Sequence, residues 1–305
     1  MKQRWVPLGK IFGPEHLPEW AKSHAAVPLI HKSGGSKVNK IYFTSRDARG
    51  RSTLGSFNLD LSGNPKIYGV SEAPYLVPGN LGAFDDDGVM ACCFCQVGDE
   101  TFLYYIGWNR GVTVPFRNSI GLARASAFGD LSRVFEGPIL DRTPLEPHFV
   151  ASCFVMEQPA GRFRMWYLSC VGWDLHAGQP RHRYHIKYAE STDGVVWERT
   201  GQVAIDFEHD SEYAISRPWV VKDRDCWKMW YSYRGESYKI GYAESSDGIK
   251  WRRMDHLVSL PRAGSWDSEM VEYPCVFDSD GRRWMIYNGN GYGISGIGLA
   301  ALSTE

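Results

Sequence analysis

Two segments of the chain match almost residue for residue, and they set the main constraint on the fold. They are Tyr188 to Arg199 (YAESTDGVVWER) and Tyr242 to Arg253 (YAESSDGIKWRR). Each reads as a strand, an Asp-Gly turn and a second strand that begins at Trp, which is the pattern of a β-hairpin. A weaker copy runs from Gly121 to Leu140. The chain therefore repeats a small β-unit.

A strand rich in aromatic residues precedes each hairpin and occurs five times. Its copies are Ile41–Asp47, Leu103–Asn109, Met165–Val171, Met229–Gly235 and Met285–Gly291. The third residues of these copies, Phe43, Tyr105, Tyr167, Tyr231 and Tyr287, follow one another at steps of 62, 62, 64 and 56 residues. A further apolar strand comes before each copy, at Ala26–Ile30, Gly88–Cys95, Phe149–Met156, Pro218–Lys222 and Pro274–Phe277. About four short strands per step of ~60 residues predict an all-β fold, a five-bladed β-propeller, with these apolar strands innermost.

The two ends of the chain predict how such a ring closes. The fifth copy ends at Gly296–Leu302, one strand short of a full blade, and the segment Trp5–Phe12 resembles the outer strand Trp197–Ile205. We therefore expect residues 1–305 to form a single domain in which residues 1–12 are the closing strand of blade five. A β-sandwich, the ordinary alternative, predicts neither five similar steps nor a displaced strand.

Charge and composition exclude several classes of partner. The 34 basic and 35 acidic residues leave a net charge of −1, which favours neither nucleic acid nor an anionic membrane. No apolar run reaches the ~20 residues of a membrane span. The first ten residues do not resemble a signal peptide, and most of the seven cysteines lie in apolar runs, so we expect a cytoplasmic protein with reduced thiols.

Ionisable and aromatic side chains gather in the segments that lead into the predicted inner strands. In a propeller these segments line one mouth of the central funnel, which is the default position of a binding site. Blade by blade they are His24; Asp85, Asp86 and Asp87; Glu146 and His148; Glu212 and Arg217; and Trp266, Asp267, Glu269 and Glu272. We expect these groups to meet in one shared cavity.

Cleavage of a glycosidic bond needs two carboxyl groups on opposite sides of the bond. The candidates for this acid and base work are Asp47, Asp85, Asp86, Asp87, Glu212, Asp267 and Glu269. The candidates for substrate binding are His24, Arg46, Trp108, Glu146, His148, Trp173, Arg217, Arg234, Trp266 and Glu272. The sequence does not choose which carboxyl is the acid.

Each of these signals has a structural alternative. The run Asp85–Asp87 is equally typical of a turn, Arg46-Asp47 of an ion pair, and the histidines of buried structural residues. Arg217 precedes Pro218 at the start of a buried strand and needs a partner there, either a carboxylate of the site or the ligand. Asp193-Gly194 and Asp247-Gly248 are expected turn residues. Cys92-Cys93-Phe94-Cys95 lacks zinc spacing and Asn288–Gly293 lacks a following helix, so no metal or cofactor is predicted.

The repeat, the acids before the inner strands and the Asp-Gly-x-x-Trp hairpins resemble the five-bladed propeller superfamily of glycoside hydrolases, families 43, 62, 32, 68, 117 and 130. The chain is also similar to an uncharacterised bacterial group associated with surface-polysaccharide gene clusters. The resemblance implies an Asp on the first inner strand as base, an Asp in the second blade and a later Glu as acid. Here the first position reads Ser23-His24-Ala25, without a carboxylate, whereas Asp85–Asp87 match the second.

Three functions follow as hypotheses. The first is a glycoside hydrolase-like enzyme that cleaves or transfers a glycosyl unit, with a furanoside or an anionic sugar as substrate. Phosphate could replace the missing base, as in a glycoside phosphorylase, with Arg46, Arg217, Arg234, His24 and His148 as the anion-binding set. The second is a carbohydrate-binding propeller of polysaccharide biosynthesis without catalysis. The third is a propeller that binds proteins at its rim.

Overall fold

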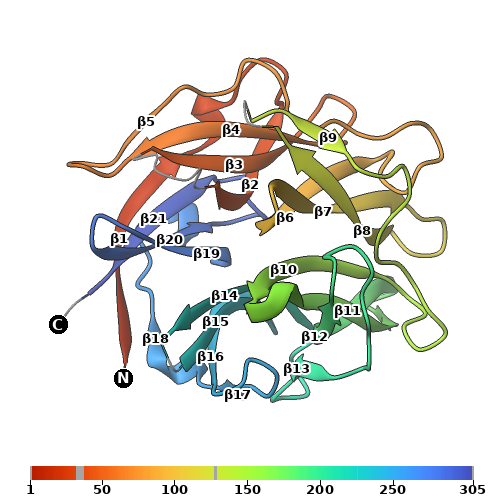
Figure 1. The fold of residues 1–305 in the computed structure, drawn as a ribbon. Coiled ribbons are helices and arrows are strands. Elements are labelled where there is room, and N and C mark those ends of the chain that lie inside the picture. The colour runs from red at the N-terminus through yellow and green to blue at the C-terminus, as the bar shows by residue number, and fades with distance from the viewer. Residues whose placement is uncertain (1, 32–37, 127–128, 225, 304–305) are drawn as a thin grey trace.

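A computed structural model describes residues 2–31, 38–126, 129–224 and 226–303 (Figure 1). Met1 and Glu305, the ends of the expected domain, lie outside the described residues. Within this part of the chain all regular structure is strand, apart from four one-turn 3-10 helices, η1 (Pro14–His16), η2 (Pro159–Gly161), η3 (Asp255–Leu257) and η4 (Ser265–Asp267). No described helix is long and apolar enough to cross a membrane. The fold is therefore all-β, as the repeat predicts.

The strands form five units, numbered here in chain order, in which successive strands pair antiparallel. Unit one holds β2 (Ser23–His31), β3 (Asn39–Arg46), β4 (Ser52–Asp60) and β5 (Lys66–Tyr68). Unit two holds β6 (Gly88–Val97), β7 (Glu100–Arg110), β8 (Phe116–Ala125) and β9 (Leu131–Arg133). Unit three holds β10 (Val150–Gln158), β11 (Arg162–His176), β12 (Gln179–Ser191) and β13 (Val203–Ile205). Unit four holds β14 (Ala214–Asp223), β15 (Cys226–Arg234), β16 (Tyr238–Ser245) and β17 (Arg252–Arg253).

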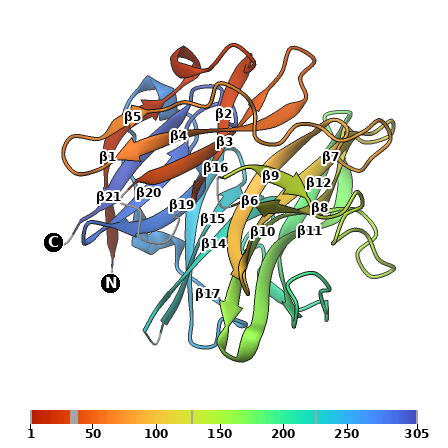
Figure 2. The same ribbon diagram turned by 45° about the horizontal axis from the view of Figure 1, so that its top comes forward.

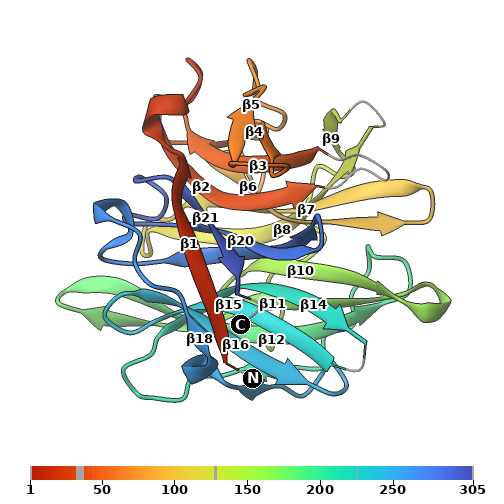
Figure 3. The same ribbon diagram turned by 90° about the vertical axis from the view of Figure 1, so that its left-hand side faces the viewer.

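Unit five joins the two ends of the chain. Its strands β19 (Glu272–Ser279), β20 (Arg282–Asn288) and β21 (Ile297–Leu302) are followed in space by β1 (Gln3–Phe12), which pairs antiparallel with β21. On its other side β1 pairs in parallel with the short β18 (Val258–Ser259). The N-terminal strand thus lies beside the last strand, as the sequence predicts (Figure 3).

The units are arranged around a common centre (Figures 1 and 2). The first strands contact one another in a closed cycle: β2 with β6, β6 with β10, β10 with β14, β14 with β19, and β19 with β2. Single parallel bridges, Ser52 with Gly88 and Tyr184 with Ala214, also join unit one to unit two and unit three to unit four. The apolar segments predicted to be innermost therefore lie at the centre of the ring.

The repeated Asp-Gly turns join neighbouring units. Tyr104 on β7 donates its hydroxyl hydrogen to the Gly194 carbonyl at 2.7 Å, and Trp166 on β11 donates its indole N–H to the Gly248 carbonyl at 2.9 Å. Both glycines have φ near +70°, at 72° and 75°, a conformation that favours glycine. The strand expected to begin at Trp197 is shorter than predicted, because β13 begins only at Val203. The connection is therefore a longer loop than a two-residue hairpin turn. Its glycine carbonyl accepts a hydrogen bond from the preceding unit.

The closing strand contributes a buried aromatic residue to the contact between units four and five. Trp5 is fully buried and packs edge-on against Trp230, with ring centroids 6.2 Å apart. Trp230 also donates its indole N–H to the side chain of Gln3 at 3.0 Å. Burial of two large rings is expected to hold the N-terminal strand in place.

We predict that Trp5→Ala lowers the free energy of unfolding by about 3–5 kcal/mol, because it removes a buried ring and leaves a cavity. Val6→Ala, on the exposed side of the same strand, is the control and should change stability by less than about 0.5 kcal/mol. Urea unfolding followed by tryptophan fluorescence measures both. Equal, small effects of the two substitutions would contradict the closing role of β1.

Candidate functional site

A bulge near the start of every first strand turns side chains toward the axis. The register with the second strand shifts between Ala26 and Leu29, Ala91 and Cys93, Ala151 and Cys153, Ser216 and Trp219, and Glu272 and Cys275. Four of the bulged residues have left-handed backbone, Val27 (φ 53°), Ser152 (38°), Arg217 (53°) and Tyr273 (56°). Such strained positions persist only where the surrounding structure holds them, and they cluster at functional sites.

Prolines explain part of this geometry. Pro28, Pro218 and Pro274 directly follow three of the bulged residues. Proline has no N–H to donate to a neighbouring strand, so within sheets it is confined to edges and bulges. The amides of the bulged residues find side-chain acceptors instead: Val27 N–H donates to Asn288 Oδ1 at 2.7 Å and Tyr273 N–H donates to Ser232 Oγ at 2.8 Å.

The four left-handed bulged residues border a cavity of about 460 Å³, the central cavity, to which all five units contribute. Its aromatic lining is Trp108, Phe116, Phe149, Tyr184, Tyr238, Tyr273 and Tyr292. Its basic lining is Arg46, Arg217 and Arg234, together with His24 and His182. Among the described residues, no aspartate or glutamate lines it. The central cavity is therefore aromatic and cationic.

The arginines of the central cavity are held by neutral groups. Arg217 is only 4% exposed, and its Nη1 donates to the Ala91 carbonyl of unit two at 2.7 Å, while its buried Nη2 has no partner in the described part of the chain. Arg234 donates to the hydroxyl of Tyr292 and lies over the ring of Tyr238, 5.3 Å from its centroid. Neither makes an ion pair with a described carboxylate.

Both histidines of the central cavity are neutral at pH 7. Burial, reinforced by the positive charge of Arg46, lowers the pKa of His24 to about 4. Burial, reinforced by Arg234 and Arg181, lowers the pKa of His182 to about 4 as well. Each imidazole therefore offers one N–H donor and one acceptor nitrogen and adds no charge.

Glu272 lies beside the central cavity and is fully buried. Both of its carboxyl oxygens lack a hydrogen-bond partner in the described part of the chain. Burial raises the pKa of Glu272 well above its usual value, and the nearby Tyr273 and the charge of Arg234 offset this only in part. Glu272 is thus a buried, unpaired carboxyl group whose neutral form is favoured, and it directly precedes Tyr273 in the lining of the cavity.

The acids predicted before the inner strands of units two to four lie elsewhere, in what we call acid–arginine anchors. In each anchor an acid from the lead-in segment pairs with an arginine that follows the third strand of the same unit. The pairs are Asp85 with Arg133 at 2.7 Å, Glu146 with Arg199 at 2.9 Å, and Glu212 with Arg253 at 2.7 Å. Each anchor includes a tyrosine of the second strand: Tyr105 donates to Asp85 at 3.1 Å, Tyr167 donates to Glu146 at 3.1 Å, and Tyr231 donates at 2.6 Å to Asp255, a second partner of Arg253.

The remaining predicted carboxylates also have local partners. Asp47 accepts from Arg51, Asp86 from the Gly82 amide, and Asp87 pairs with Arg110. Asp267, fully buried, accepts from the amides of Ala263 and Gly264 and from the hydroxyl of Tyr287. Glu269 is exposed. The structure thus does not bring these acids together in the central cavity, and their catalytic role stays a prediction.

Of the predicted binding residues, the structure brings His24, Arg46, Trp108, Arg217 and Arg234 together in the lining of the central cavity. Trp173 packs behind the wall against Phe116 and Phe149, and Trp266 packs on Tyr287 in unit five. His148 is half-buried directly before Phe149.

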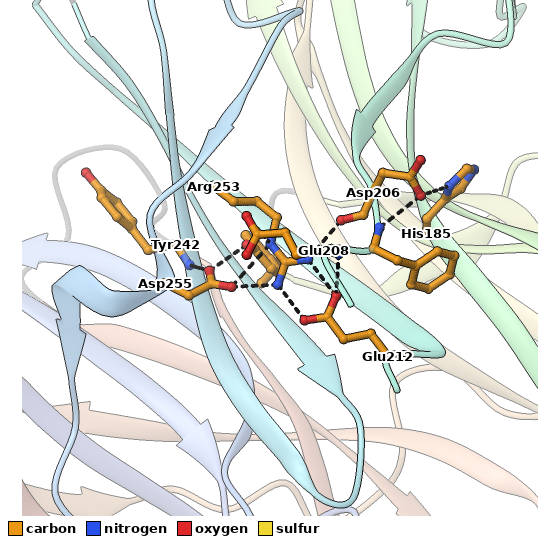
Figure 4. Close-up of polar contacts among 9 residues, drawn as sticks. His185, Asp206, Glu208, Glu212, Tyr242, Arg253 and Asp255 are labelled. Atoms are coloured by element: carbon orange, nitrogen blue, oxygen red, sulfur yellow. Dashed lines mark hydrogen bonds and ion pairs between the residues drawn. The ribbon is translucent and has the colours of Figure 1, made fainter. Parts of the chain in front are cut away.

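A second, larger cavity of about 650 Å³ lies beside unit four (Figure 4). Its lining includes Glu208, Glu212, Tyr233, Arg253 and Asp255. Arg253 contacts all three of the acids, at 3.6, 2.7 and 2.6 Å. Because Arg253 already holds all three of these acids, this cavity is a weaker candidate than the central one.

The sequence patterns did not predict the tyrosine and histidine lining of the central cavity, namely His182, Tyr184, Tyr238, Tyr273 and Tyr292. Two signals could have found part of it. His182 and Tyr184 alternate along β12 and so share one face of the strand. Tyr273 stands between Glu272 and Pro274 at a position that the proline marks as a bulge.

Comparison with known proteins places this fold. A solved structure titled "Glycoside hydrolase" has a TM-score of 0.76 at 16% identity and covers 98% of this chain and 92% of its own. The endo-arabinase of Bacteroides thetaiotaomicron (TM-score 0.63, 12% identity, 97% and 98% covered) and the catalytic domain of the Coprinopsis cinerea GH62 α-L-arabinofuranosidase (0.65, 10%, 99% and 98%) are similar too. The structural neighbours are glycoside hydrolases of GH43, GH62 and GH130 type, which are five-bladed propeller families. The resemblance seen in the sequence is confirmed at the level of the fold.

In sequence, the chain is 41% identical over 299 residues to the uncharacterized protein Rv1502 of Mycobacterium tuberculosis, and the match covers 98% of this chain and 99% of that protein. The uncharacterized protein MT1551 of the same species matches equally well. The chain belongs to the family of these proteins. No known family profile matches it.

We predict that Glu146→Gln destabilises the protein by about 3–5 kcal/mol at pH 7, because it leaves Arg199 and Lys187 without a charged partner. Burial raises the pKa of Glu146, but the hydrogen bond from Ser169 and the charges of Lys187 and Arg199 outweigh it, so the pKa lies below 4.5. The stability from this ionised form is present above about pH 4.5 and is lost as pH falls through the lower, folded pKa.

Urea unfolding of Glu146→Gln between pH 3 and 7 should therefore show a flatter acid limb than the wild type. The exposed Glu136→Gln serves as control and should follow the wild-type curve. A Glu146→Gln curve parallel to that of the wild type would contradict the anchor.

Proposed function

We propose that the five units are the blades of one five-bladed propeller spanning residues 1–305, closed by β1. The closed cycle of contacts among the first strands supports this, and so does the likeness to propeller glycoside hydrolases. A cytoplasmic location is part of the proposal, because all seven cysteines are free thiols and six of them are buried.

We further propose that the central cavity binds a carbohydrate and that the protein is a glycosidase-type enzyme that cleaves or transfers a glycosyl unit. The observation that carries this is Glu272, a fully buried carboxyl group without a partner in the described part of the chain, beside a cavity walled by aromatic rings. Aromatic faces stack on sugar rings, and the departing glycosidic oxygen needs a proton donor. In this proposal Glu272 takes the role of general acid, for which the sequence had offered Glu146, Glu212 or Glu269 without choosing between them.

A second candidate activity is transfer of the glycosyl unit to phosphate. The described lining of the central cavity holds no carboxylate to activate water, but it holds three arginines. In this reaction a phosphate oxygen forms a bond to the anomeric carbon, the bond from that carbon to the leaving oxygen breaks, and the leaving oxygen takes the proton of Glu272. The arginines would hold the phosphate. Binding without catalysis is the remaining alternative.

We predict that Glu272→Gln lowers kcat about 10²–10⁴-fold on a glycoside with a poor leaving group, with KM nearly unchanged, because it removes the general acid and keeps the shape of the side chain. Release of sugar from a panel of glycosides, with and without phosphate, measures this. Glu136→Gln, at an exposed glutamate that does not line the central cavity, should retain wild-type turnover. Wild-type turnover by Glu272→Gln would place the acid elsewhere, and sugar binding without any wild-type turnover would favour the binding-only alternative.

The same variant tests the protonation state of Glu272 without a substrate. A carboxyl whose pKa is raised by folding contributes stability that is present below its unfolded pKa, about 4.5, and is lost as pH rises through the folded pKa. Glutamine cannot ionise, so Glu272→Gln should be more stable than the wild type at pH 8 and lose this part of the pH dependence. Thermal unfolding between pH 5 and 9 measures both.

A further inference from the structure

The central cavity has an unusual balance of charge. Half-buried arginines elsewhere in the described chain include Arg133 and Arg283, which pair with Asp85 and Asp223. Arg46, Arg217 and Arg234 make no ion pair with a described carboxylate, although all three border one cavity. Arg46 is exposed and Arg234 is half-buried, but Arg217 is buried. A buried guanidinium without a counter-charge is costly, so this arrangement is expected where a ligand supplies the negative charge.

Arg217 is the best placed of the three. Its guanidinium extends from unit four to the Ala91 carbonyl of unit two, and its left-handed backbone at the bulge directs it there. Nη1 makes this contact, whereas Nη2 is buried and has no partner in the described part of the chain. Arg217 is more than nine-tenths buried, so bulk water does not satisfy the free N–H groups as it would at the surface.

Further donors around the central cavity also lack partners among the described residues. The hydroxyls of Thr44 and Ser216, both nearly buried, the Nε of Arg234 and the Nε2 of His182 are in this position. Hydroxyl and guanidinium donors around an uncompensated positive charge match the oxygens of a carboxylate, a phosphate or a sulfate.

Arg217 lies near the proposed acid Glu272, which indicates that the sugar itself carries the negative charge. Arg217 lies on β14 and Glu272 and Tyr273 lie on β19, and these two first strands contact each other. Tyr184, Tyr238 and Tyr273 lie in the same wall, and the hydroxyls of Tyr184 and Tyr238 are 2.6 Å apart. A sugar ring against these aromatic faces would hold a charged substituent next to the arginines and its glycosidic oxygen near Glu272.

We propose that the substrate is a negatively charged sugar whose carboxylate, phosphate or sulfate group binds to the free face of Arg217 in the central cavity. The proposal rests on the carbohydrate function proposed above and names its substrate class. Arg234 and the hydroxyls of Thr44 and Ser216 complete the subsite. Neutral glycosides, which leave these donors unpaired, bind weakly.

The first experiment uses matched pairs of ligands on the intact protein. Glucuronate is compared with glucose, galacturonate with galactose, and mannose 6-phosphate with mannose, by calorimetric titration at pH 7 and constant ionic strength. At least one charged sugar should bind about tenfold or more tightly than its neutral counterpart. Equal affinities within every pair would overturn the proposal.

The second experiment identifies the group that holds the charge. Arg217→Gln should weaken binding of the charged sugar tenfold or more and leave the neutral sugar unchanged. Arg252→Gln, exposed on β17, is the matched control and should bind as the wild type does. If Arg217→Gln does not fold, Arg234→Gln at the more open side of the cavity should show the same selective loss. Retained selectivity in every folded variant would overturn the assignment.

A third arm uses inorganic phosphate and inorganic sulfate alone. One outcome is that these ions raise the melting temperature of the wild type while charged sugars bind no more tightly than neutral ones. In that case the anion is a free co-substrate, and the proposal that the sugar carries the negative charge is wrong. If they compete with the charged sugar for the Arg217 site, the proposal holds. Turnover of a neutral glycoside that depends on Glu272 and not on Arg217 would refute this proposal and leave the proposed enzyme intact.

Discussion

The architecture depends on the contact between a carboxyl group and a tyrosine on the second strand of a unit. This acid–tyrosine contact joins Asp85 to Tyr105, Glu146 to Tyr167 and Asp267 to Tyr287, where the acid comes from the segment that leads into the first strand. In unit four the acid is Asp255, which follows β17 and accepts from Tyr231. These tyrosines are the residues whose regular spacing reveals the repeat. Unit one has Phe43 at this position, packed against Phe12 and Trp20, and the acids that precede its first strand, Glu15 and Glu19, are exposed. The buried acid and the tyrosine hydroxyl are thus absent together, because each needs the other when buried.

Fixing the lead-in segments has a consequence for the centre of the ring. The first strands begin from anchored positions and then bulge, and the strain of the left-handed residues is balanced by contacts between units. The side chain of Asn288 in unit five accepts from the Val27 amide and donates to the Ala25 carbonyl in unit one, at 2.7 Å in both cases. Arg217 similarly connects units four and two. The residues that shape the central cavity are therefore also those that close the ring.

The sequence predicted the fold well because the fold is periodic. The spacing of the aromatic strands predicted the five units, and the short final copy predicted that the N-terminal strand pairs with the last one. Neither prediction requires knowing where a side chain points. The site is different. Position before an inner strand could not tell that Asp85 or Glu146 turns away from the axis toward an arginine more than forty residues later in the same unit. Such pairings depend on tertiary contacts that carry no local signal.

Arg217 is a site residue whose need for a partner could be predicted from its sequence position. A buried arginine before a proline was expected to need either a carboxylate or a ligand, and the structure excludes a described carboxylate and supplies a single carbonyl. By contrast, Glu272 was expected only to bind, because its raised pKa follows from a burial that the sequence does not encode locally.

The distribution of charge in the folded chain links these observations to function. The net charge of −1 gives no sign of a charged site. In the folded chain, however, the acids of the anchors pair with arginines, whereas the arginines that line the central cavity have no described carboxylate as partner. A concave site of one sign with low-dielectric aromatic walls focuses its field on whatever enters. The anchors make this separation stable, because they neutralise the acids that would otherwise compete with a ligand for Arg217. Selectivity for a charged sugar would then come from the same pairing that holds the units together.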